Sequence, residues 1–190
     1  MRALADRGFD LGLVVCGKRS AYIERSDAAF RAECEKVAES YRTQGSRGTA
    51  DWYGQGPARV QFQNKDPRGW ADFDRVLAEH SDTGARLTQL GVQRLRPSLY
   101  DLRDDLAALR VPTLVISGDE DDACLETDIM LKRTIPTSGL AVFPKTGHTI
   151  NLEEPDLFNR TVTDFLTAVE NDAWPERDPR SVSASTLGTK

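Results

Sequence analysis

The sequence predicts an α/β fold in which parallel strands alternate with helices, preceded by a block of helices. Short apolar runs at residues 113–117 and 140–143 are typical of buried strands, and residues 124–134 and 155–169 repeat apolar side chains at helical spacing. The order strand, helix, strand, helix implies parallel strands with right-handed crossovers. A third apolar run, residues 11–16, is nearly continuous, as expected of a strand buried on both faces.

The middle of the chain is predicted to be mainly helical. Apolar residues recur at helical spacing in four segments, at residues 27–44, 67–80, 82–94 and 99–109. The last of these should end before Val111-Pro112, because the residue preceding a proline disfavours the helical conformation. Residues 45–66 are rich in glycine, glutamine and small polar residues, so they are predicted to form loops and short turns. The polar tail, residues 171–190, is expected to be disordered.

Charge and composition argue against several classes of function. A formal net charge of −5 leaves no basic patch to neutralise phosphates, so we expect neither nucleic acid nor a membrane as a partner. No apolar run is long enough to cross a bilayer, and the first residues lack the apolar region of a signal peptide. The three cysteines are widely spaced and form no metal-binding motif. We therefore expect reduced thiols in a cytoplasmic protein.

Residues able to do chemistry follow the two predicted strands of the C-terminal half. Asp119, Asp121 and Asp122 come directly after the first strand, and His148 follows the second. Ligands and chemistry gather at the carboxyl ends of parallel strands, which lie about 4.8 Å apart when adjacent. A carboxylate at this edge can accept the Nδ1–H of a histidine and fix its tautomer. The Nε2 atom is then left to take a proton from a nucleophile.

The acidic run from Asp119 to Asp122 has a second interpretation, as a solvated loop or a cation site. It lacks the glycine and the final glutamate of a calcium-binding loop, because Met130 stands where that glutamate belongs. We therefore expect no metal and no cofactor. His80 has no comparable context and is predicted to be a surface residue at a helix end. Glu153 and Glu154 are expected to favour the N-terminus of the last helix through its dipole.

Two motifs resemble the C-terminal half of the α/β-hydrolase family. The first is PTLVISGDED, from Pro112 to Asp121, and the second is Gly147-His148 followed by Glu154 and Pro155. The resemblance is strong over roughly the last third of the chain. It extends weakly to residues 11–17, which are similar to the sixth strand of that family.

The resemblance implies roles for particular residues. Asp121 would be the triad acid and His148 the triad base, with Asp119 as a second candidate for the acid. The segment before them would be a helical cap over the substrate pocket. Some of its aromatic side chains would line an apolar pocket, and the candidates are Trp52, Tyr53, Phe62 and Trp70.

The same resemblance divides the chain into four parts. Residues 1–20 would be a sheet segment that follows the nucleophile helix, and residues 21–105 the helical cap. Residues 106–170 would be the C-terminal α/β core with the triad acid and histidine, and residues 171–190 the disordered tail. The fold class is therefore a partial α/β-hydrolase fold plus a helical cap.

The family's nucleophile elbow, G-x-S-x-G, does not occur in this sequence. Ser20 and Cys16 lie at or after the strand that should follow the elbow, and neither has its glycines. We therefore expect a truncated hydrolase or the product of an internal start codon. The parent enzyme would cleave a small ester, lactone or related acyl or carbon–carbon bond, with a small molecule as substrate, and this chain alone would be inactive.

A non-catalytic binding or interaction module built on the same half-fold is the alternative. It is physically harder to accept, because the strand at residues 11–16 would then be an open apolar edge. Such an edge is a template for pairing, so self-association through it is expected. A cooperative, monomeric chain would favour the binding module, and aggregation would favour the truncated hydrolase.

Overall fold

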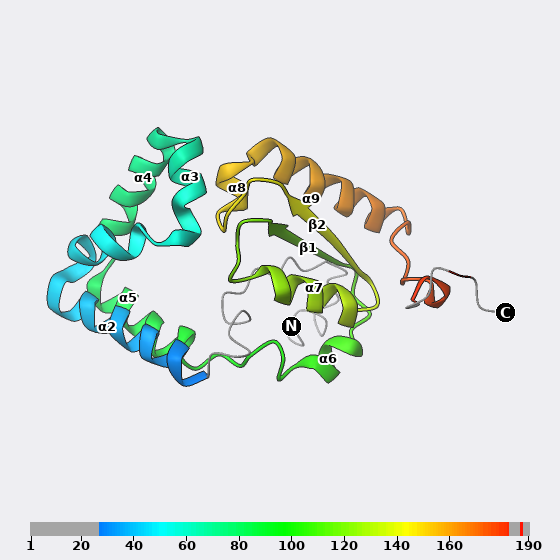
Figure 1. Ribbon diagram of the computed structural model, residues 1–190, viewed down its shortest axis with the longest axis horizontal. Helices are drawn as coiled ribbons and strands as arrows, with labels where there is room; N and C mark the ends of the chain where they lie inside the picture. The colour runs from blue at the N-terminus through cyan, green and yellow to red at the C-terminus, as the bar shows by residue number, and fades with distance from the viewer. Residues whose placement is uncertain (1–26, 183–186, 188–190) are drawn as a thin grey trace.

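The computed structural model describes residues 27–182 and residue 187, so the strand predicted at residues 11–16 lies outside this part. Two groups of elements follow one another along the chain (Figure 1). Helices come first, and a small parallel sheet flanked by helices comes second. Among the described helices, none is long and apolar enough to cross a membrane.

The first group, which we call the helical block, comprises residues 27–93. Its elements are α2 (Asp27–Thr49), η2 (Ala50–Gly54), η3 (Pro57–Arg59), α3 (Val60–Lys65), α4 (Pro67–Ala78), α5 (Asp82–Thr88) and η4 (Gln89–Gln93). The predictions of helices at 27–44 and 67–80 are confirmed by α2 and α4. The helix predicted at 82–94 is divided into α5 and the π-helical turn η4.

The prediction of loops at residues 45–66 is wrong, because this segment is helical along most of its length. At Gly45 the backbone of α2 leaves the helical conformation, with a φ of 69° that glycine adopts without strain, and a second helical stretch follows directly. Beyond the kink, the Ser46 amide donates to Asp82 Oδ1 over 2.6 Å, and the Ser46 hydroxyl donates to the carbonyl of His80 over 2.7 Å. These contacts across the block favour helix where local composition favours turns.

The second group is built on two parallel strands, β1 (Thr113–Gly118) and β2 (Ser138–Phe143). Their register pairs Thr113 with Ser138 and Gly118 with Phe143, so the carboxyl ends of both strands lie side by side. The remaining helices are α6 (Arg103–Ala107), α7 (Leu125–Thr134), α8 (Ile150–Glu153), α9 (Pro155–Glu170) and η5 (Pro179–Ser181). The strands predicted at 113–117 and 140–143 and the helices predicted at 124–134 and 155–169 are confirmed. The helix predicted at 99–109 is shorter.

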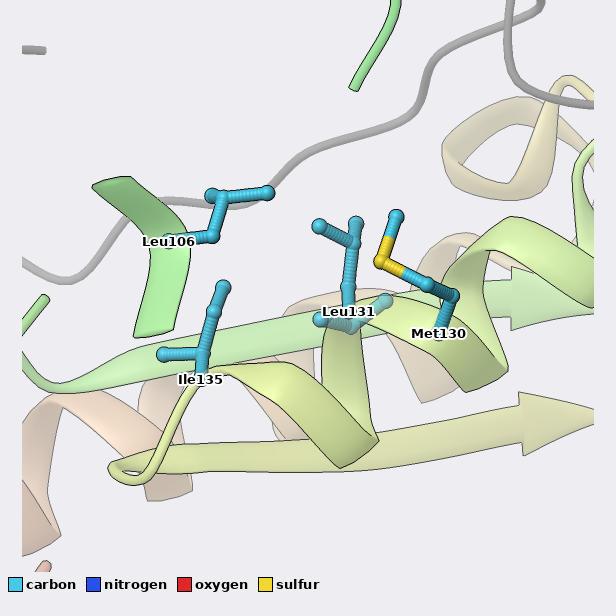
Figure 2. Packing of buried hydrophobic residues seen from close by; sticks show 5 residues of the cluster. Leu106, Met130, Leu131 and Ile135 are labelled. Atoms are coloured by element: carbon cyan, nitrogen blue, oxygen red, sulfur yellow. The ribbon is translucent and has the colours of Figure 1, made fainter. Parts of the chain in front are cut away.

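The sheet is covered on both faces, which explains why every residue of β1 is buried. Side chains alternate between the two faces of a strand, so Val115 points opposite to its neighbours. Val115 belongs to the cluster on the α7 face. The other members, Leu106, Met130, Leu131 and Ile135, are labelled in Figure 2. The cluster on the α9 face consists of Leu114, Ile116, Phe143, Ile150 and Phe165.

The expectation of a disordered tail does not hold for the residues that directly follow α9. The Trp174 ring packs edge-on against Phe165, with ring centroids 4.8 Å apart, and its Nε1 donates to the carbonyl of Thr137 over 2.7 Å. The ring fills the space beside Gly139, where a Cβ would lie less than 3.0 Å from it. One aromatic side chain therefore fixes a segment whose composition is otherwise typical of disorder.

Candidate active site

Asp121 and His148 form a close pair at the carboxyl ends of the two strands. Asp121 lies in the turn after β1, and His148 lies in the loop between β2 and α8. Nδ1 of His148 and Oδ2 of Asp121 are 2.6 Å apart, a short distance for a hydrogen bond. The Asp121 side chain is 5% exposed and the histidine ring 24%. The pair therefore has a buried acid and an imidazole that reaches the surface.

Backbone hydrogen bonds join the two loops that carry this pair. The amide of Asp119 donates to the carbonyl of Phe143 over 3.0 Å, and the amide of Glu120 donates to the carbonyl of Thr146 over 3.0 Å. A Cβ on Gly118 would lie less than 3.0 Å from the carbonyl oxygens of Thr146 and Gly147. Glycine at this position permits the close approach that brings the acid to the histidine.

Asp119 and Asp122 occupy different positions from Asp121. Both are exposed, and the Asp119 carboxylate accepts a hydrogen bond from the amide of Thr146 over 3.2 Å. Of the three acids considered, Asp121 has the hydrogen bond with His148. The geometry thus favours Asp121 over Asp119 as the partner of the histidine.

A buried glutamate, Glu153, accepts hydrogen bonds from the loop that carries His148. Its Oε2 accepts from the amide of Gly147 over 2.7 Å, and its Oε1 accepts from the amide and the hydroxyl of Thr149 over 3.0 and 2.9 Å. The sequence alone predicts only that Glu153 stabilises the N-terminus of the last helix through the helix dipole. The spacing of five residues between His148 and Glu153, with a single turn of helix between them, is the signal that points to this role.

The helical block touches the same loop. The amide of His148 donates to the carbonyl of Ala58 over 3.1 Å. Lys65 Nζ lies 2.6 Å from Glu154 Oε1 and 3.2 Å from the hydroxyl of Thr146. Gln61 also donates to the carboxylate of Glu120. The block therefore contacts both loops at the carboxyl edge of the sheet.

A second buried carboxyl group, Asp128 on α7, lies within electrostatic range of the pair. Its burial raises the pKa of Asp128 to about 7, while a hydrogen bond from Ser117 lowers it, the charge of Asp121 raises it and His148 lowers it. This residue was not expected to belong to the site. The signal in the sequence is a carboxylate on the apolar face of a predicted helix, between Leu125 and Leu131.

Cys124 is a further residue in contact with the His148 ring. Its Sγ is 3.8 Å from Nδ1 of His148, and the residue is 1% exposed. One ligand atom each from Asp121, Cys124 and His148 lie within 4.8 Å of one another. This set combines a thiol, an imidazole and a carboxylate, which are the three donor types that zinc sites use.

The four aromatic residues expected to line a pocket occupy different environments. Phe62 and Trp70 are buried, and they pack with Phe73 in the core of the helical block. Trp52 is 38% exposed and its Nε1 donates to the hydroxyl of Ser40. Tyr53 lines a cavity of about 410 Å³ between α2, α4 and α5. The structure thus places Phe62 and Trp70 as core residues of the block, because their rings fill its interior.

His80 is exposed at the end of α4, as the sequence predicts, and it lines the same cavity as Tyr53. Other lining residues are Tyr41, Leu77, Ser81, Gly84, Ala85, Thr88 and Gln89. Asp121 and His148 are not part of this lining.

Comparison with known proteins yields partial matches. No family model matches the chain. It is 38% identical over 81 residues to a 2-hydroxy-6-oxo-2,4-heptadienoate hydrolase of Pseudomonas putida, which covers 42% of this chain and 28% of the relative. It is 35% identical over 78 residues to a 2-hydroxy-6-oxo-6-phenylhexa-2,4-dienoate hydrolase of Burkholderia cepacia, covering 40% and 27%. The matches thus span about a quarter of the length of these relatives.

A solved structure gives a more extensive match. A thermophilic esterase from Thermogutta terrifontis superposes with a TM-score of 0.68 and 27% identity, over 83% of this chain and 56% of the esterase. The small parallel sheet with helices on both faces agrees with a part of that architecture. The described part of the chain therefore has a partial α/β-hydrolase fold, and the curated relatives and solved structures that it matches all point to that fold family.

Proposed function

We propose that this chain supplies the acid and the base of a Ser-His-Asp triad in a hydrolase that acts on a small molecule. The observation that carries the proposal is the 2.6 Å contact between Asp121 Oδ2 and His148 Nδ1 at the carboxyl edge of the sheet. Chemistry gathers at this edge in parallel α/β folds. The burial of the acid and the partial exposure of the ring match the needs of such a pair.

Each member of the pair has a defined task in this proposal. Asp121 accepts the Nδ1–H of His148, which fixes the tautomer and stabilises the imidazolium that forms during the reaction. Nε2 of His148 then takes the proton of the attacking serine and later gives it to the leaving group. The serine of a G-x-S-x-G elbow, which is not among the 190 residues, would come from polypeptide outside this sequence.

The bond that is cleaved is inferred from the relatives. The two curated relatives are named as hydrolases of 2-hydroxy-6-oxo-dienoates, and the solved structure is named as an esterase. We infer an ester, a lactone or a related acyl or carbon–carbon bond in a small substrate. We also propose that the helical block acts as a cap over that substrate, since it reaches the loop of His148 through Ala58 and Lys65.

The acid–base pair can be tested in the chain as it stands by proton NMR. The Nδ1 proton shared with Asp121 is expected to give a low-field resonance, because it lies in a short hydrogen bond to a carboxylate. The resonance should disappear in Asp121→Asn and in His148→Gln. Asp119→Asn is the matched control and should retain it, since Asp119 bonds to Thr146 instead. Absence of the resonance from the folded chain would favour the binding-module alternative.

An assay with short p-nitrophenyl esters tests the proposal that the chain alone lacks a nucleophile. We expect no hydrolysis above the rate in buffer, because the sequence contains no G-x-S-x-G serine for the pair to activate. Turnover by the purified 190-residue chain that is lost in His148→Ala would contradict this part of the proposal.

A further inference from the structure

Three different ligating side chains meet on the Nδ1 side of His148. Asp121 Oδ2 lies 2.6 Å and Cys124 Sγ lies 3.8 Å from this nitrogen. Asp121 and Cys124 come from one turn, in which the amide of Cys124 donates to the carbonyl of Asp121 over 2.8 Å. The turn therefore presents a carboxylate and a thiol, three residues apart, to the same nitrogen.

We propose that Asp121, Cys124 and His148 form a binding site for a thiophilic divalent cation of the zinc type, with Oδ2, Sγ and Nδ1 as the ligands. Cation binding itself is independent of the proposed hydrolase function. Its consequence for that function, set out below, rests on the proposed role of His148.

The separation of Sγ and Nδ1 is close to that in a tetrahedral zinc site, and the three donor atoms all lie within 4.8 Å of one another. Zinc–sulfur and zinc–nitrogen bonds of about 2.3 and 2.0 Å place tetrahedral ligands about 3.6 Å apart. The Sγ to Nδ1 distance is 3.8 Å. The carboxylate oxygen must move away from Nδ1 by less than about 1 Å, from hydrogen-bond distance to the spacing between two zinc ligands. Three protein ligands leave the fourth position to water.

The chemistry of the three ligating groups determines which cations the site would bind. A thiolate and an imidazole favour zinc, cobalt or cadmium over magnesium and calcium, which take oxygen ligands. The nearby Asp128 carboxyl is nine-tenths or more buried and interacts with both Asp121 and His148.

Binding moves two protons in this scheme. The Cys124 thiol loses its proton to solvent, because the thiolate is the form that binds metals. The neutral imidazole keeps one proton, which moves from Nδ1 to Nε2 so that Nδ1 can donate its lone pair to the metal. Cation affinity should therefore increase with pH, because binding releases a proton.

The bound cation would disable the proposed base. With Nδ1 on the metal and a proton on Nε2, His148 has no lone pair left to accept the proton of a serine. Asp121 would also bind the metal instead of the imidazole. The site would thus make the hydrolase sensitive to zinc, and a chelator would reverse the inhibition.

Cobalt(II) is a suitable probe, because its thiolate complexes have a charge-transfer band in the near ultraviolet. Titration of the full 190-residue chain should give this band with one cobalt per chain. The double variant Cys16→Ala/Cys34→Ala leaves Cys124 as the sole thiol of the sequence and should retain the band. Cys124→Ser should abolish it. No band in the double variant, or an undiminished band in Cys124→Ser, would overturn the proposal.

A second measurement covers the case in which Cys124→Ser folds poorly. His148→Gln retains the thiol, so its cobalt affinity should drop by at least about tenfold relative to the unmodified chain, since even the loss of a group behind a ligand costs about 10- to 100-fold. An unchanged affinity in this variant would exclude His148 as a ligand. The low-field resonance of the metal-free chain reports on the Asp121–His148 pair separately, so its absence would refute the acid–base proposal and leave the cobalt result to decide the cation site.

Discussion

At the scale of single residues, Glu153 shows how a buried carboxylate can fix the loop that carries His148 through the residues on either side of it. Its two oxygens accept three hydrogen bonds from Gly147 and Thr149, the residues on either side of His148. Hydrogen bonds to charged groups contribute about 1.5–3 kcal/mol each. The direction of the imidazole ring is therefore coupled to a side chain that has no exposed surface.

Replacement of Glu153 by glutamine should destabilise this loop. The amide nitrogen of glutamine cannot accept a hydrogen bond, so an amide of Gly147 or Thr149 loses its partner. We expect a decrease of about 1.5–3 kcal/mol in the free energy of unfolding, measured with urea, and a broadened Nδ1 resonance of His148. Glu154→Gln is the matched control, because Glu154 lies at the surface beside Lys65, and it should change stability by less than about 1 kcal/mol.

The buried carboxyl of Asp128 predicts a particular dependence of stability on pH. Its pKa is raised from 3.8 to about 7 in the folded chain, mainly by burial. The folded state then binds more protons than the unfolded state between these values, so stability decreases as pH rises from about 4 to 7. Asp121, His148 and Ser117 are the groups that face it.

Asp128→Asn should remove most of this decrease. Relative to the unmodified chain, the variant should gain stability progressively between pH 4 and pH 7, by an amount on the order of 3–4 kcal/mol at the upper end. Urea midpoints at several pH values measure the difference. Asp122→Asn alters an exposed acid of the same segment and should leave the slope unchanged. Parallel pH profiles for Asp128→Asn and the unmodified chain would contradict the assignment of this titration.

At the scale of elements, the end of β1 is packed too closely for any side chain. Gly118→Ala would place a methyl group less than 3.0 Å from two carbonyl oxygens of the His148 loop. The loop must move, so we expect a loss of about 1–3 kcal/mol in stability together with loss of the low-field resonance. Gly91→Ala is the control. A Cβ at Gly91 meets nothing within 4 Å, and the helical backbone should gain up to about 1 kcal/mol.

Sequence patterns predicted the strands and helices in which apolar residues follow a regular pattern, such as β1 and α9. The continuous burial of β1 and the apolar stripe of α9 are properties of the elements themselves, so the pattern of apolar residues along the sequence detects them. The adjacency of two parallel strand ends predicted that an acid among Asp119, Asp121 and Asp122 meets His148, and the resemblance to α/β-hydrolases singled out Asp121. Cys124, Asp128 and Glu153 were not predicted as parts of the site. Their positions depend on how α7 and the loop before α8 pack, which a single sequence does not encode locally.

The helical segment at residues 45–66 was missed for a related reason. Glycine and glutamine favour turns by local propensity, but contacts with residues 80–82 and burial of Thr49 and Ala50 decide the conformation. Propensity differences amount to about 1 kcal/mol per residue, which tertiary packing readily exceeds. Packing also overrides local preference at Trp174. The contact of its ring with Phe165 orders a segment whose polar composition favours disorder.

At the scale of the whole molecule, the helical block and the sheet-containing part meet where α3 lies beside α8 (Figure 1). The amide of His148 donates to Ala58 in the block, and Gln61 and Lys65 bond to the loops beside it. Movement of the block relative to the sheet must break the bond to Ala58. The rate of hydrogen exchange at the His148 amide therefore measures how often the block leaves the loop.

The double variant Gln61→Ala/Lys65→Met should accelerate exchange of this amide, because it removes the side-chain contacts that hold Ala58 in place. We expect an acceleration of about three- to thirtyfold, equivalent to the loss of about 0.5–2 kcal/mol of local stabilisation. Amides within α9 should exchange at unchanged rates, since they depend on the packing of the sheet. Equal acceleration in α9 would mean that the variant loosens the whole fold, and an unchanged His148 amide would mean that the backbone contact at Ala58 holds the block without these side chains.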